Sequence, residues 1–283
     1  RWLNAHTWTS ADNIKVWRDG DKLSWSVGWN YADKYTTKGS PWASIGSGEY
    51  TGSSDNWATN SPLYNVKLKD VDIIKGDWTF PKPEPGTLAG FPFEQYHYYY
   101  QVYMSSSPSG TPHTGDIAIV LFDNWYYQQP TFGEPITING VTYQYRFIPA
   151  PAAGHGPFLQ ICLPNSHVDQ SQPDANGKLV FTNVDIDGII KWGLLQGFWD
   201  SEHYLTHISN AIEVQMTASK TFISEDMKYT IQHKGQSTAT VIPSWKGNTE
   251  PVAVAGVSIN PSSATVMAGV TTQLGYTISP SNA

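Results

Sequence analysis

Short β-type segments separated by turn residues constrain this chain most. Runs rich in Val, Ile, Thr, Tyr and Trp alternate with Gly, Pro, Asn, Asp and Ser clusters, and helical periodicity is nearly absent. This pattern predicts an all-β, two-sheet antiparallel jelly-roll sandwich with a concave cleft. The expected strands are 22–30, 64–71, 76–80, 96–105, 116–122, 136–138, 141–149, 158–163, 211–218 and 229–233.

Two local signals refine this picture. Asn139-Gly140 between two apolar runs predicts a tight hairpin. In Asn183–Leu195, apolar residues recur at spacings that approximate i, i+3, i+4, which predicts one amphipathic helix with Gly197 at its carboxyl end.

Composition narrows the function classes. Aromatic residues make up 13% of the chain, including 12 Trp, whereas charged residues make up only 14%. Many flat rings on a nearly neutral surface suit uncharged ligands with hydroxyl edges, such as sugars. The net charge of −7, without a Lys/Arg run, makes nucleic acid an unsuitable partner, and no apolar run has the length of a membrane span.

Cofactors and metals are not expected. The single cysteine, Cys162, lies in an apolar run and is interpreted as a packing residue. His203 and His207 have the spacing of a zinc helix but lack its Glu, and Asp185-Ile-Asp187-Gly188 is an incomplete calcium loop. No nucleotide-binding or nucleophile-elbow motif is present.

Two carboxylates interrupt otherwise apolar strands. In Ala211–Met216, alternation sends Ile212, Val214 and Met216 to the core and leaves Glu213 on the opposite face. In Thr114–Phe122, Asp116, Ala118, Val120 and Phe122 share the face opposite Ile117, Ile119 and Leu121. Glu213 is either a solvated strand residue or an acid catalyst in a cleft, and Asp116 is either a turn residue or a catalytic one.

The order of several motifs resembles that of glycoside hydrolase family 12, the endoglucanases and xyloglucanases. Gly115-Asp-Ile-Ala-Ile-Val-Leu-Phe122 resembles the family's Gly-Asp-Tyr-Glu-(Leu/Ile)-Met-Ile-Trp strand, and Ala211–Gln215 resembles its Gly-Thr-Glu-Pro-Phe strand. Tyr204-Leu205, Trp25–Trp29, Asn65–Lys67, Tyr100–Tyr103 and the helix follow in the family's order. The resemblance spans most of residues 1–235.

This resemblance implies an endo-acting hydrolase that cleaves a β-linked polysaccharide, a β-1,4-glucan or xyloglucan, with retention. Glu213 matches the acid/base residue of the family. The family's nucleophilic Glu aligns with Ala118, and the family's supporting Asp aligns with Gln101. Retention needs two carboxyls about 5–5.5 Å apart, which is near the separation of facing residues on adjacent antiparallel strands. The expected sugar-binding residues are Trp8, Trp25, Trp29, Gln101, Trp125 and Gln215.

Ala118 leaves three explanations open. Ala118 could be an engineered replacement of Glu, Asp116 could serve as nucleophile in a divergent site, or the chain could be an inactive sugar-binding relative. A non-catalytic carbohydrate-binding module and a polysaccharide lyase are the alternative functions. The excess of acidic over basic residues argues against a lyase, which needs a cationic cleft for uronates.

The chain is expected to have three parts: the jelly-roll domain over residues 1–245, a linker over 246–256, and residues 257–283. The last part, with Val257–Val266 and Ser279–Ala283, resembles the start of a bacterial Ig-like domain of group 2. That resemblance implies a secreted or cell-surface bacterial protein. A monomer that binds polysaccharide or oligosaccharide, without membrane insertion, is expected.

Overall fold

A computed structural model describes the side chains of residues 61–83, 96–110, 112–124, 133–149, 156–167, 170–213 and 222–242, together with Ser24. Elsewhere it describes only the backbone of strand segments. The chain divides into two compact units, Arg1–Trp245 and Lys246–Ala283. None of the described helical segments has the length and apolar character that crossing a membrane requires.

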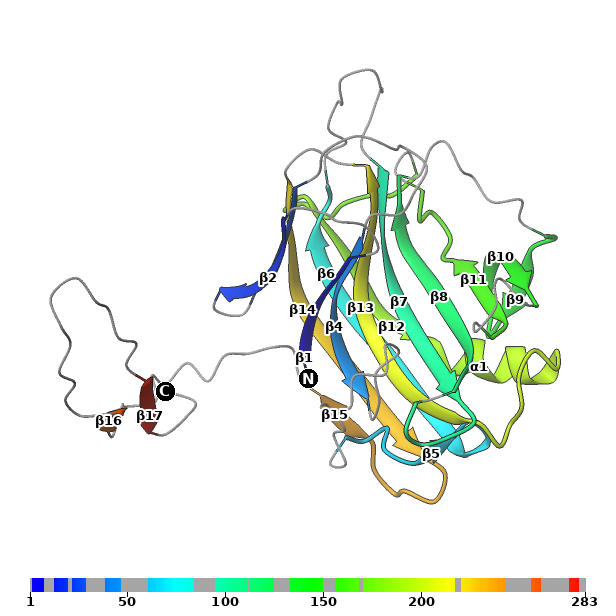
Figure 1. The fold of residues 1–283 in the computed structure, drawn as a ribbon. Helices are drawn as coiled ribbons and strands as arrows, with labels where there is room; N and C mark the ends of the chain where they lie inside the picture. The colour runs from blue at the N-terminus through cyan, green and yellow to red at the C-terminus, as the bar shows by residue number, and fades with distance from the viewer. Residues whose placement is uncertain are drawn as a thin grey trace, which may run out of the picture. The chain divides into compact units, whose positions relative to one another are not determined.

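The described residues of the first unit form two β-sheets and one α-helix (Figure 1). The larger sheet has the order β1-β4-β13-β7-β8-β11-β10-β9, with β5 paired to β13. Its strands are β1 (Trp2–Thr7), β4 (Gly39–Gly46), β5 (Val66–Lys67), β7 (Gln95–Ser105), β8 (His113–Asp123), β9 (Ile136–Ile138), β10 (Val141–Ile148), β11 (Phe158–Cys162) and β13 (Tyr204–Met216). This architecture confirms the predicted two-sheet β fold, although β11 pairs with β8 in parallel.

The smaller sheet has the order β12-β6-β14-β3-β2, with β15 paired to β14. Its strands are β2 (Asn13–Asp19), β3 (Lys22–Gly28), β6 (Val71–Pro81), β12 (Lys178–Asp185), β14 (Lys220–His233) and β15 (Thr240–Ile242), and a 3-10 turn, η1 (Leu68–Asp70), precedes β6. In the second unit, β16 (Gly256–Asn260) pairs with β17 (Gly275–Ser279) as antiparallel strands. The predicted Ig-like start remains a prediction.

The core between the sheets is mainly aromatic. Trp78 of β6 is fully buried, packs against Phe80, Tyr98 and Tyr100, and donates a 2.9 Å hydrogen bond from Nε1 to Ser224 Oγ. Burial of these rings removes a large apolar area from water. These aromatic residues therefore pack in the core, whereas the composition suggested many aromatic rings on the surface.

The hairpin is confirmed, and the helix is confirmed from Ile186 onwards, whereas residues 183–185 of the predicted helix belong to β12. Helix α1 (Ile186–Leu195) buries Ile186, Ile189 and Ile190. Its amino end is capped by Asp185, whose carboxylate accepts a 3.0 Å hydrogen bond from the Gly188 backbone. Its carboxyl end is closed by hydrogen bonds from the Gly197 and Phe198 amides, with Gly197 at a φ of 72°. Asn139 and Gly140 have positive φ values, as a type I′ turn requires.

Asp185 and Asp187, the acids of the incomplete calcium loop, lie at the start of α1 and pair with Lys75. Its ammonium lies between the two carboxylates, at 3.0 Å from Asp187 Oδ1 and in close contact with Asp185. The carboxylates are thus neutralised by a side chain of β6. Among the described residues, no group of three or more His, Cys, Asp and Glu side chains is arranged to hold a metal ion.

Candidate active site

The candidate site lies on the face of the larger sheet that is turned away from the core, which we call the distal face. Alternation places Ile117, Ile119 and Ile212 in the core, fully buried, as predicted. Their neighbours along β8 and β13, Asp116, Ala118 and Glu213, therefore lie on the distal face. Strand β7 lies between β8 and β13, and the register places Glu213 in line with Asp123, so Ala118 and Glu213 are not facing residues of adjacent strands.

Strand pairing arranges the distal face in four rows that cross the strands. The Glu213 row contains Glu213, His97, Asp123 and His167. The next row contains Ala211, Tyr99, Val120, Cys162 and Gln144. The Ala118 row contains Ser209, Gln101, Ala118, Gln160 and Arg146. The Asp116 row contains His207, Tyr103, Asp116, Phe158 and Ile148.

A β-bulge in β8 changes two assignments. The register shifts so that Tyr98 pairs with Phe122 whereas Tyr99 pairs with Val120. Phe122 consequently lies in the core and not beside Ala118, which corrects the predicted alternation. The same shift turns Asp123 to the distal face opposite His97, and regular alternation along the sequence could not have shown this.

Ala118 interrupts a polar row. The amide side chains of Gln101 and Gln160 stand on the strands at either side of Ala118, and Arg146 follows on β10. Arg146 Nη2 donates a 2.8 Å hydrogen bond to Gln160 Oε1. Ala118 itself is 4% exposed and packs with Tyr99 and other non-polar residues of the neighbouring row. Amide donors and a guanidinium are groups that stabilise a carboxylate. The alanine at position 118 has no carboxylate for them to stabilise.

Glu213 is the most accessible carboxylate of the distal face for which the structure gives an exposed fraction. Its side chain is 22% exposed, and Oε2 lies 3.5 Å from His97 Nε2. Burial raises the pKa of Asp116 and of Tyr103, both in the Asp116 row, and the negative charge of Glu213 adds a smaller increase to each.

Asp116 has an environment that favours its protonated form. Burial, reinforced by the charge of Glu213, raises the pKa of Asp116 to about 8. Gln101 Nε2 donates a 3.2 Å hydrogen bond to Asp116 Oδ2, so the residue at the family's supporting-Asp position contacts this carboxyl. At neutral pH, Asp116 is mainly a neutral acid and hence a poor nucleophile.

Replacing Asp116 tests this environment. Asp116 should contribute a loss of unfolding free energy as pH rises from about 4 to about 8, since at this residue the folded state retains a proton that the unfolded state releases. Asp116→Asn should abolish this loss. At pH 9 the unfolding free energy of the variant should exceed that of the unsubstituted chain by about 2–5 kcal/mol. Urea unfolding between pH 4 and pH 9 measures the difference.

Asp174 provides a control of opposite sign. Hydrogen bonds from the Lys178 and Asn176 backbones lower the pKa of Asp174. Asp174→Asn should therefore reduce stability above pH 4 and have no effect below the folded-state pKa. If the difference in unfolding free energy between Asp116→Asn and the unsubstituted chain stayed the same from pH 4 to pH 9, the environment described for Asp116 would be contradicted.

Several predicted binding residues lie outside the described side chains. Trp8, Trp29 and Trp125 lie outside the described residues altogether. For Trp25 and Gln215 only the backbone is described; Trp25 belongs to β3 of the smaller sheet, paired with Phe222. The predicted packing role of Cys162 is confirmed, because its side chain is buried against Tyr99 and Val120, and burial raises its pKa.

No protein-family model and no curated protein matches the chain. Solved structures do match its fold. An endoglucanase from Rhodothermus marinus is 14% identical with a TM-score of 0.59, covering 81% of this chain and 90% of its own. A family 12 xyloglucanase from Bacillus licheniformis is 11% identical with a TM-score of 0.59, covering 80% and 91%.

A third match is the xyloglucanase domain of a type three effector from Sinorhizobium fredii, in complex with cellobiose. It is 12% identical with a TM-score of 0.55, covering 81% of this chain and 93% of that domain. At such identities the likeness concerns the fold. The chain therefore has the β-jelly-roll fold of the family 12 glycoside hydrolases.

Proposed function

We propose that the distal face binds a β-1,4-glucan or a xyloglucan and is built for endo-acting hydrolysis with retention. The interrupted polar row carries this proposal: Gln101, Gln160 and Arg146 surround position 118 with the groups that a nucleophilic carboxylate needs. The fold shared with endoglucanases and xyloglucanases supports the substrate class. Because polysaccharides are found outside cells, the proposal includes a protein that acts there.

The resemblance to family 12 assigns one role to each position. A carboxylate at position 118 attacks the anomeric carbon while the glycosidic C–O bond breaks, and Glu213 gives its proton to the leaving oxygen. Glu213 then takes a proton from water, whose oxygen displaces the carboxylate. With Ala118, the first bond cannot form. The chain with Ala118 is therefore expected to bind the glycan and to cleave it very slowly, as a sugar-binding relative would.

Calorimetry and product analysis test this function. The natural chain should bind cello- or xyloglucan oligosaccharides with a Kd between about 1 μM and 1 mM and release few reducing ends. Glu213→Ala should weaken binding by about tenfold, because it removes a charged hydrogen-bond partner.

Glu202→Ala serves as the control, since Glu202 is exposed and paired with Lys67 and Lys69. It should leave binding unchanged. The absence of binding to every neutral β-glucan would contradict the proposal. Unsaturated, ultraviolet-absorbing products from a uronate polymer would identify a lyase instead.

A further inference from the structure

The Glu213 row ends at a pocket. From Glu213 on β13 the row passes His97 and Asp123, and Asp123 forms a parallel bridge with His167. Asp123 and His167 also line a cavity of about 510 Å³. Neighbouring strands lie about 4.8 Å apart, so the cavity begins at Asp123, about 10 Å from Glu213 along a line that crosses two strand spacings. A glycan lying along this row would reach the pocket.

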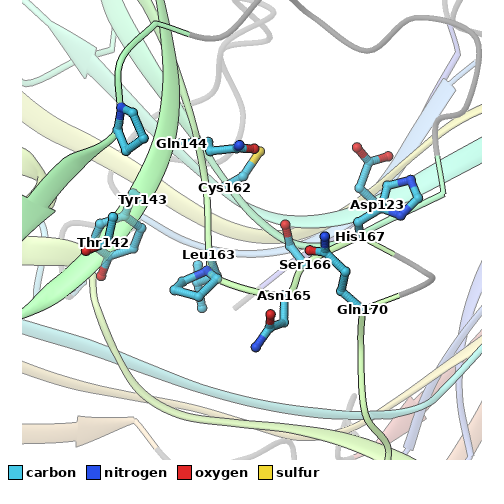
Figure 2. A pocket seen from close by; sticks show the side chains of 12 residues that line it. Asp123, Thr142, Tyr143, Gln144, Cys162, Leu163, Asn165, Ser166, His167 and Gln170 are labelled. Carbon is cyan, nitrogen blue, oxygen red and sulfur yellow. The ribbon is translucent and has the colours of Figure 1, made fainter.

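The lining of the pocket suits an uncharged, hydroxyl-rich ligand. Figure 2 shows Asp123 and His167 at one end and Thr142 and Tyr143 at the other. The remaining lining residues are Pro135, Gln144, Cys162, Leu163, Pro164, Asn165, Ser166 and Gln170. None of these twelve described residues is a Lys or Arg, so a phosphate or a uronate would find Asp123 but no such cation. Amides and hydroxyls beside apolar walls are typical of a sugar-binding site.

Three amide side chains are available to a ligand. Within the described part of the chain, the side chains of Gln144, Asn165 and Gln170 make no hydrogen bond to protein. Gln144 and Gln170 are exposed and come from different elements, β10 and the segment that follows β11. Each amide can both donate to and accept from sugar hydroxyls.

The pocket is held by backbone hydrogen bonds. The Asp123 amide donates to the Ser166 carbonyl at 2.8 Å, and the Gln170 amide donates to the His167 carbonyl at 2.9 Å. Asn165 adopts a φ of 59°, a left-handed conformation that Asn tolerates better than most residues. This framework exists before a ligand arrives, which lowers the entropic cost of binding.

We propose that this pocket is a distal subsite for an uncharged sugar unit of the glycan that the distal face binds. The inference rests on the proposed function and extends the binding surface beyond the Glu213 row. The thiol of Cys162 takes no covalent part, because burial raises its pKa and keeps it protonated.

An oligosaccharide series tests the subsite in the full chain. Affinity should rise from cellobiose to cellohexaose, since only the longer ligand reaches the pocket. A Gln144→Leu/Gln170→Leu double variant should bind cellohexaose about tenfold more weakly, the loss expected from two neutral hydrogen bonds, and bind cellobiose as the natural chain does. Gln172→Leu, an exposed position next to the pocket segment, should change neither affinity.

The possible failures are distinguishable. The subsite would be overturned if the double variant bound cellohexaose as tightly as the unsubstituted chain. It would also be overturned if the double variant lost affinity equally for cellohexaose and cellobiose at an unchanged melting temperature. Either result would leave the proposed function intact. If the double variant melts at a lower temperature than the unsubstituted chain, the single variants Gln144→Leu and Gln170→Leu are tested instead. The ratio of cellohexaose affinity to cellobiose affinity is then compared in the same way. If the natural chain binds neither ligand, the proposed function and the subsite both fail.

Discussion

An Ala118→Glu variant is expected to hydrolyse β-1,4-glucan or xyloglucan at least about a thousandfold faster than the chain with Ala118, because loss of a nucleophile costs a hydrolase several orders of magnitude in rate. The new carboxylate would stand between the amides of Gln101 and Gln160, with the Arg146 guanidinium in the same row. These groups would hold it ionised and oriented. Release of reducing ends from a polysaccharide panel measures the effect.

Ala118→Gln is the matched control. Gln has the size of Glu without its negative charge, so it tests whether the carboxylate or the added volume matters. Both variants crowd a position that is 4% exposed, which should cost about 1–3 kcal/mol of stability, and urea unfolding checks that each remains folded. Equal activity of the two folded variants, or activity that survives Glu213→Gln in the Ala118→Glu background, would refute the assigned roles.

A Trp78→Ala variant is expected to lose about 3–5 kcal/mol of unfolding free energy, the largest stability change proposed for this chain. The substitution empties the centre of the aromatic core, where Trp78 contacts Phe80, Tyr98 and Tyr100. It also leaves the buried Ser224 hydroxyl without its donor. Urea or thermal unfolding, followed by the remaining tryptophan fluorescence, measures the loss.

Leu195→Ala provides the comparison. Leu195 is a large apolar residue that is 84% exposed, so its truncation should change stability by less than about 0.5 kcal/mol. Similar losses in Trp78→Ala and Leu195→Ala would show that the described core does not determine stability.

Local patterns predicted the parts of the fold that depend on local rules. The alternation in β13 placed Ile212 in the core and Glu213 opposite it, and Asn139-Gly140 located the hairpin turn. Helix α1 was found because three isoleucines follow a 3.6-residue period. In each case the decisive information lies within a few residues of the chain.

The remainder depends on long-range pairing. Strand β12 has no clean alternation, since Val180 is 51% exposed, and it was not expected. The bulge in β8 depends on how β7 and β8 meet, so Phe122 was assigned to the wrong face and Asp123 was not recognised as a distal-face residue. The separation of β8 from β13 by β7 is likewise a property of the sheet order.

The parallel pairing of β8 with β11 also has a consequence for how the chain acquires its site. Phe158 pairs with Asp116, 42 residues earlier, whereas Val141 pairs with Ile138 across a two-residue turn. Local hairpins form within microseconds, but pairings between distant segments must first overcome the entropy of closing a long loop. We expect β9 and β10 to fold early and β11 to join β8 late. Gln160 and Arg146 would then come together with position 118 only in that late step, so a partly folded chain would have no assembled site.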